Sequence, residues 1–169
     1  MALPKKLKDF NLFGDGNNWQ GQIPQLTLPE LARNMEEYRG GGMDGPVELD
    51  MGQNLIEFSW TAAGIIADLF NNYGTHIHDA SLLRFTGSYE SDETGEVTAV
   101  EVVVRGRHKT IGMGDVEAGG QNQIETTTTC SYYKLTVDGV EIIEMDLPGM
   151  VFRVRGTDRL AERRRALGV

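Results

Sequence analysis

The sequence predicts a mainly β protein, an antiparallel β-sandwich or barrel with one internal helix and one C-terminal helix. Short runs rich in Val, Thr and Tyr recur along the 169 residues and are separated by Gly, Pro and Asp. One run alternates with period two, which places Val100, Val102 and Val104 on the face opposite its charged residues. Asp138-Gly139 lies between two such runs and predicts a hairpin, because a type I′ turn needs positive φ at both residues.

The first half of the chain contains five β-like runs. Pro29 cannot donate a ladder hydrogen bond, so we expect an edge or a bulge there, within one long kinked strand over 23–38. Residues 39–46 contain four glycines and a proline and predict a loop. The next two runs are expected to pair through a short turn at Gly52. The expected strands are 11–13, 23–28, 31–38, 47–51 and 55–60.

Helical periodicity is confined to two places. Apolar residues fall at three- and four-residue spacing over 62–73, and Gly74 stands where a C-terminal cap belongs, so we predict a helix there. A final helix is expected over 158–167, capped by Thr157 or Asp158 and ended by Gly168. The strands expected between the two helices are 82–89, 97–109, 124–137, 140–147 and 151–154, with a turn at 92–95.

Composition predicts one soluble domain spanning residues 1–169 and made in the cytoplasm. With 40% hydrophobic and 24% charged residues, the chain can bury an adequate core without a metal or disulfide. The single cysteine, Cys130, has no partner in its own chain. No apolar signal segment and no apolar run of about 20 residues is present. A net charge of −9 argues against tight nucleic-acid binding, which depends on neutralising phosphates.

The charge is unevenly distributed along the chain. Residues 9–152 hold 23 acids and 7 bases, whereas 153–169 hold six arginines and two acids. One interpretation is a solvated acidic surface next to a basic helix. The other is complementarity between copies, with the basic end of one subunit meeting the acidic body of another.

The sequence offers little catalytic chemistry. His76, His78 and Asp79 could share a metal ion, but a structural loop is favoured because no Cys or further His lies nearby. His108 is expected to be a partly buried sheet residue rather than a base, and Cys130 a buried inert thiol. The glycine-rich loop lacks the Lys-Ser/Thr of a phosphate loop. We therefore expect no enzyme, cofactor or metal. The basic run 105–109 could contact DNA, although a solvated strand face is favoured.

Several stretches together resemble the tail tube proteins of contractile-tailed phages, a family shared with R-type bacteriocins. Their order and spacing cover nearly the whole chain. They include Leu26–Pro29, Glu37–Pro46, Leu49–Gly52, Phe85–Tyr89, Thr94–Glu96, Val100–Val103, Arg105–Arg107, Tyr132–Gly139, Glu144–Asp146 and Gly156–Leu160.

This resemblance implies a noncatalytic virion protein of the tail, assembled in the host cytoplasm. Members form hexameric rings, each with a continuous inner β-barrel, which stack into a tube inside the contractile sheath and conduct the genome during ejection. The implied partners are further copies of the chain, sheath protein, baseplate, tail terminator and tape measure protein. Double-stranded DNA would pass through the lumen without tight binding.

The resemblance also implies which residues make contacts between subunits. The glycine-rich loop with the following hairpin, about 39–60, would be an extended arm. Its expected contact residues are Tyr38, Arg39, Gly40, Gly41, Gly42, Met43, Asp44, Gly45, Pro46, Asp50, Met51 and Gly52. Further oligomer contacts are expected at Arg105, Arg107, Asp158, Arg159, Arg163, Arg164 and Arg165.

If carboxylates line the lumen, they would repel passing DNA from the wall. Two alternatives to the phage tube are open. The first is the tube of an R-type bacteriocin or a related injection particle without DNA. The second is a monomeric β-sandwich module that binds a sugar or peptide. The second is disfavoured because Trp19 and Trp60 are far apart in sequence and no aromatic cluster stands out.

Overall fold

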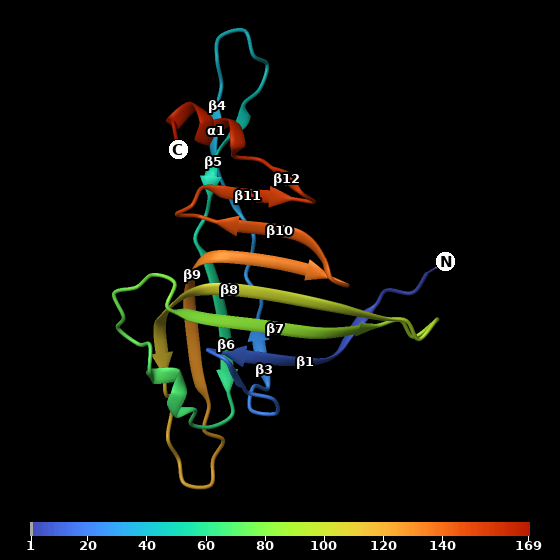
Figure 1. Cartoon of the computed structure of the whole chain (residues 1–169), viewed down its shortest axis with the longest axis vertical. Helices are drawn as coiled ribbons and strands as arrows, with labels where there is room; N and C mark the ends of the chain where they lie inside the picture. Colours follow the sequence, from blue (N-terminus) through green and yellow to red (C-terminus); the bar gives the residue numbers. More distant parts are fainter. Residues whose placement is uncertain (1) are drawn as a thin grey trace.

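The computed structural model describes residues 2–169, which form one ten-stranded antiparallel sheet and a separate two-stranded hairpin (Figure 1). The path through the main sheet is β12-β11-β10-β9-β8-β7-β1-β2, and β6 joins it by pairing with β9 and with β3. The main-sheet strands are β1 (Lys6–Gly14), β2 (Asn17–Asn18), β3 (Gln25–Thr27), β6 (Ile56–Ala62), β7 (Ser81–Glu90), β8 (Val97–Gly112), β9 (Ile124–Val137), β10 (Val140–Asp146), β11 (Val151–Val154) and β12 (Thr157–Asp158). The hairpin consists of β4 (Arg33–Tyr38) and β5 (Val47–Gln53).

The two longest strands, β8 and β9, run through both halves of the main sheet. The C-terminal half of β9 pairs with β10, whereas its N-terminal half, Ile124–Cys130, pairs with β6. The change of partner falls at Ser131, next to a register shift between Arg105 and Gly106 of β8. The sheet therefore bends at this point, and the N-terminal half of β9 turns away from β10 toward β6.

The core fills the space enclosed by this bend. Phe58 and Trp60 of β6 pack with tilted rings 5.7 Å apart, and Trp19 stacks on Trp60 at 6.3 Å. Leu12 of β1 and Phe85 of β7 are buried in the same cluster. Aromatic and aliphatic side chains from β1, β6, β7, β8 and β9 thus share one apolar interior, which is the dominant stabilising element of such a fold.

The structure confirms several local predictions. Val102 and Val104 of β8 are buried while Arg105 and Arg107 are exposed, as the alternation required. Asp138 and Gly139 have φ of 49° and 77°, so the β9–β10 turn has positive φ at both positions. The strands predicted over 124–137 and 151–154 have those bounds.

The internal helix predicted over 62–73 is wrong in extent. Only Ala67–Phe70 are helical, as the four-residue 3₁₀ turn η1. Ile66 and Leu69 are buried, but Ile65 and Tyr73 are exposed, so the apolar spacing does not describe one buried face. Gly64 is a weak helix former, and the segment crosses from β6 to β7 as a loop.

Two predicted strand relationships are also wrong. β5 and β6 do not pair through Gly52; β5 pairs with β4, and β6 pairs with β3 and β9. The long kinked strand over 23–38 is two strands in two different sheets, β3 and β4, separated at Pro29. Gly52 has φ of +123°, and together with Pro29 it marks where the chain leaves and rejoins the main sheet.

The C-terminal helix α1 (Ala161–Leu167) begins three residues later than predicted because Thr157 and Asp158 form β12 against β11. Its N-cap is Leu160 without a side-chain cap, and the Asp158 carboxylate instead accepts the Leu160 N–H. Gly168 ends the helix with φ of 74°, as predicted. Within residues 2–169, none of the helical segments has the length and apolar character needed to cross a bilayer.

Candidate assembly surfaces

The β4–β5 hairpin with its loop 39–46, called the arm below, projects beyond the body of the molecule (Figure 1). Directly paired residues share a face, and successive pairs alternate. One face therefore presents Tyr38 opposite Val47 and Glu36 opposite Leu49. Tyr38 is 54% exposed, and both apolar partners are similarly exposed. The arm thus presents an apolar surface to solvent.

The other face of the arm carries a like-charged pair. Glu37 lies directly opposite Glu48, and Met35 lies opposite Asp50. Neither Glu37 nor Glu48 forms an ion pair with another described residue. Like charges facing each other across two strands destabilise the pairing. A two-stranded hairpin is also marginal without further packing. Both faces of the arm therefore lack the contacts that stabilise an isolated hairpin.

Arg33 anchors the base of the arm to the body. Its Nε lies 2.8 Å from Oδ2 of Asp50, and its guanidinium lies 5.3 Å from the ring centre of Phe152 in β11. The hydrogen bond from Arg33 and the backbone N–H of Gly52 lower the pKa of Asp50. The Gln53 side chain donates to the carbonyl of Ala32. Asp50 and Gly52 therefore position Arg33 within the arm, and Arg33 contacts the body at Phe152; nothing in the sequence marked Arg33 as the partner of Asp50.

Helix α1 packs beside the base of the arm and adds a basic surface. Arg164 pairs with Asp158 and donates to the carbonyl of Met150, so it fixes α1 to the strand region that precedes it. The hydrogen bond from Arg164 lowers the pKa of Asp158 to about 2. Arg165 pairs with Glu162. By contrast, Arg159 and Arg163 are exposed and form no ion pair within residues 2–169.

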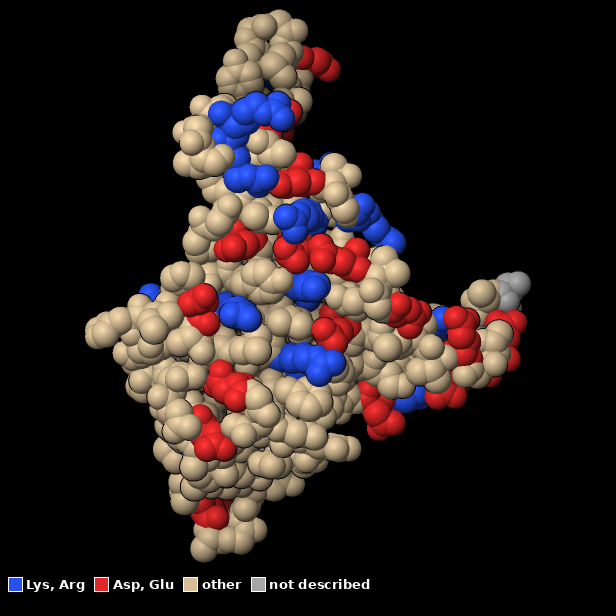
Figure 2. Space-filling model, viewed as in Figure 1, with Lys and Arg blue, Asp and Glu red and all other residues tan. Residues whose placement is uncertain are grey.

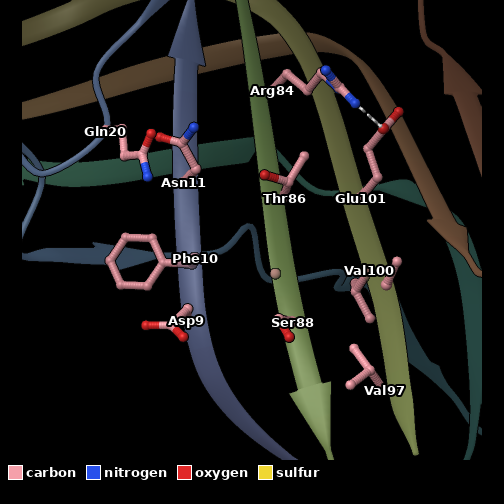
Figure 3. A pocket seen from close by; sticks show the side chains of 12 residues that line it. Asp9, Phe10, Asn11, Gln20, Arg84, Thr86, Ser88, Val97, Val100 and Glu101 are labelled. Carbon is pink, nitrogen blue, oxygen red and sulfur yellow. Dashed lines mark hydrogen bonds and ion pairs between the residues drawn. The ribbon is translucent and has the colours of Figure 1, made fainter.

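The outward face of β7, β8, β9, β10 and β11, called the wet sheet face below, carries alternating charges. Strand register places Arg84, Glu101, Lys134 and Glu144 on it. Arg84 points toward Glu101 across a shallow pocket over β1, β7 and β8, with an N–O distance of 2.8 Å (Figure 3). The remaining bases and acids of the face are Glu90, Arg105, Arg153, Glu141, Asp146 and Asp158.

The two arginines predicted at contacts in β8 differ in their surroundings. Arg105 lines a concavity with His78, Tyr132 and Lys134 and has no ion pair among the described residues. Arg107 donates only a long hydrogen bond, 3.5 Å, to the carbonyl of Thr75. Arg105 and Arg107 are both exposed, whereas the neighbouring His108 is buried.

The candidate ligands and nucleophiles have structural partners. Nδ1 of His78 lies 2.9 Å from the Ser131 hydroxyl, and no three His, Cys, Asp or Glu side chains of residues 2–169 cluster as a metal site would require. His108 is buried between the hydroxyls of Thr128 and Ser81, and burial lowers its pKa. Cys130 is buried, and burial raises the pKa of its thiol to about 12. His108 and Cys130 therefore belong to the interior of the sheet, whereas His78 is exposed on its surface.

Comparison with known sequences gives a consistent result. Residues 4–168 match the model of the family described as phage tail tube protein FII. The chain is 41% identical over 175 residues to the tail tube protein of Escherichia phage P2, covering all of both chains. It is 36% identical over 165 residues to the major tail tube protein of Serratia phage KSP20, covering 96% of this chain and 95% of that protein.

Solved structures agree at the level of the fold. The sheath/tube terminator of the PVC extracellular contractile injection system, in its extended state, has a TM-score of 0.57 at 10% identity, covering 75% of this chain and 92% of that one. A chain of the PVC sheath-tube complex has a TM-score of 0.56 at 10% identity, covering 75% and 87%. The full-length family match and the two phage relatives decide the assignment: the chain belongs to the phage tail tube protein FII family, whose role is structural and not enzymatic.

Proposed function

We propose that this chain, as one domain over residues 1–169, forms hexameric rings that stack into the inner tube of a contractile phage tail. The tube would lie inside the sheath, join the baseplate and the tail terminator, enclose the tape measure protein and conduct the genome at ejection. It would be assembled in the host cytoplasm and remain in the virion. Membership of the tail tube family supports the structural role.

The arm is the observation that carries the proposal. Tyr38, Val47 and Leu49 lie exposed beside Glu36 on one of its faces. Glu37 opposes Glu48 on the other, so the hairpin has little to stabilise it alone. A neighbouring subunit would bury the apolar face and neutralise the carboxylates. The contact residues predicted from Tyr38 to Pro46 and at Met51 are all on this arm, which supports their assignment to subunit contacts.

We further propose that the wet sheet face lines the lumen. Three of its bases are paired with acids: Arg84 with Glu101, Lys134 with Glu141 and Arg153 with Glu144. Paired cations attract phosphates weakly because their charge is already balanced, so DNA would slide past such a wall. This refines the expectation of a carboxylate-lined lumen: the acids act largely by neutralising the bases beside them.

Electron microscopy of the purified chain tests the proposal. We expect rings or tubes with a central hole. Val47→Asp combined with Leu49→Lys should abolish them while leaving the circular dichroism of the monomer unchanged, because both side chains are exposed and neither new charge faces a like charge across the hairpin. Val140→Asp alters another exposed valine, at the β9–β10 turn, and should leave assembly intact. A chain that stays monomeric at high concentration would refute the tube and favour a binding module.

The relatives favour a phage tube over a bacteriocin tube, since both are named as proteins of phages. Genes for a capsid and a terminase beside the gene for this chain would support genome transport. A tail cluster that lacks both would instead indicate an injection particle without DNA.

A further inference from the structure

Apart from the arm, the two ends of the molecule along its longest axis carry opposite charges; the arm, residues 33–53, projects beyond one of them and holds five acids and two arginines. At one end, called the basic end below, residues 147–169 hold six arginines and two acids. Both acids are already ion-paired, with Arg164 and Arg165. The exposed arginines at this end that form no ion pair with a described residue are Arg155, Arg159 and Arg163. Figure 2 shows the resulting concentration of basic side chains over α1 and the last strands.

The opposite end, called the acidic end below, consists of residues 62–70 and 110–128. These segments contain four acids and no Lys or Arg. The long β8–β9 connection and η1 lie there, at the bottom of Figure 1. The four acids are Asp68, Asp115, Glu117 and Glu125, all exposed and none ion-paired within the described part of the chain.

The same axis separates the open edges of the main sheet. β12 pairs only with β11 and lies next to the basic end, whereas β2 and β3, each with one partner, lie toward the acidic end (Figure 1). Open strand edges present unpaired backbone groups that can pair with another chain. Contact along this axis would bring an edge strand of one copy near an edge strand of the next.

Exposed apolar side chains stand among the charges at both ends. Val116 is 82% exposed and Ile65 65% exposed at the acidic end, and Leu167 is 65% exposed at the basic end. An interface needs apolar surface as well as charge, since exposed ion pairs contribute little by themselves. The basic end and the acidic end thus carry complementary charges, and each also exposes apolar side chains that a neighbouring copy can bury.

We propose that, within a ring, the basic end of one copy docks on the acidic end of the next. A two-fold contact between equal ends would oppose like charges, so the complementarity selects a head-to-tail arrangement. Such a contact closes into a ring when its rotation is a whole fraction of a turn. This inference rests on the proposed ring-forming function and adds the surfaces and the polarity that join neighbours.

Charge reversal tests the contact. Arg159→Glu with Arg163→Glu should raise the concentration needed for rings at least about tenfold, the effect of losing interfacial charge pairs and adding repulsion. Asp115→Arg with Glu117→Arg should do the same. Rings should return when the two variants are mixed or when all four changes are combined. The measurement is the fraction of rings in sedimentation velocity over about 0.05–0.5 M salt. The wild type should lose most of its rings at the high-salt end of this range, because salt screens the contact.

A matched control separates specific pairing from net charge. Glu90→Arg with Glu93→Arg makes the same charge change at the β7–β8 turn, away from the acidic end. It should not rescue Arg159→Glu with Arg163→Glu. Rescue by this control, or no effect of either reversal on rings that the wild type forms, would overturn the inference while leaving the tube intact. Absence of rings in the wild type would overturn the proposed function and the inference together.

Cross-linking tests the polarity directly. Cys130 is buried and its thiol has a raised pKa, so an added pair, Arg159→Cys with Glu117→Cys, can be joined selectively by a bismaleimide. The two positions lie at opposite ends of one copy, so cross-links must join different copies. We expect a ladder that stops at the closed ring. A ladder extending beyond one ring would place the contact between rings and overturn the inference, as would the absence of cross-links in assembled rings.

Discussion

Gly106 should be intolerant of any side chain, because it sits where the sheet bends. A Cβ at this position would lie 1.9 Å from the carbonyl oxygen of Thr129 and 2.9 Å from Cα of Cys130. Both are backbone atoms of β9, so no rotamer change relieves the clash. The adjacent register shift is the point at which β9 changes partner from β10 to β6.

The geometry sets the size of the effect. Ordinary contact begins at 3.4 Å, so Gly106→Ala requires β9 to move by about 1.5 Å, the difference between 3.4 and 1.9 Å. A backbone hydrogen bond near 2.9 Å would lengthen beyond its useful range. Losing about two such bonds at about 1 kcal/mol each, with an overpacking cost of about 1–3 kcal/mol, gives a loss of about 3–5 kcal/mol in the free energy of unfolding.

Urea unfolding followed by tryptophan fluorescence measures this loss, since Trp19 and Trp60 are buried in the core. Gly112→Ala is the matched control. Gly112 lies in β8 like Gly106, but a Cβ there would meet the carbonyl oxygen of Glu125 at an ordinary 3.8 Å. It should stay within about 1 kcal/mol of the wild type. The reasoning fails if Gly106→Ala is as stable as Gly112→Ala.

Three further predictions concern the arm, His108 and Cys130. Arg33→Ala should raise the concentration needed for rings about two- to fivefold in sedimentation, the effect of losing its cation–π contact with Phe152. Arg84→Ala is the control, because it removes an equivalent ion pair and a contact with Phe13, and it should not raise that concentration. Equal effects of the two changes would contradict the role of Arg33 as an anchor. Burial lowers the pKa of His108, so the unfolded chain binds a proton at this residue before the folded chain does, and the free energy of unfolding should fall as pH drops below about 6.5. His108→Gln should reduce this dependence on pH in urea melts, and an unchanged dependence would contradict the role of His108. With a pKa of about 12, the Cys130 thiol should react with Ellman's reagent at about pH 8 only after unfolding; rapid labelling of the native chain would contradict its burial.

Local sequence signals predicted the hairpins because their causes are local. Asp138-Gly139 specifies a turn through the φ angles that both residues accept, and the alternation on β8 follows from a strand with one buried face. The terminal glycine, Gly168, ended α1 for the same kind of reason. Each of these outcomes depends on a few adjacent residues.

The wrong predictions concern segments whose structure depends on residues far away in the sequence. The 62–73 periodicity suggested a helix, but burial depends on what packs against each residue, and only Ala62 at the end of β6, Ile66 and Leu69 meet the core. Val47–Gln53 and Ile56–Ala62 are adjacent in sequence yet pair with different strands. The ion pair between Asp50 and Arg33 could not be read from the sequence for the same reason, while the expected subunit contact of Asp50 stays a prediction.

The sequence by itself determined the mainly β class, the turns, the excess of acid in the body and the basic C-terminal segment, because composition and short-range backbone preferences need no tertiary context. Only the tertiary structure decided that the arm is a separate hairpin with two unsatisfied faces, and that acid and base lie at opposite ends of the sheet. Strand partners are chosen by packing and hydrogen bonding between residues far apart in the chain, so the surfaces available for assembly emerge only when the sheet is complete.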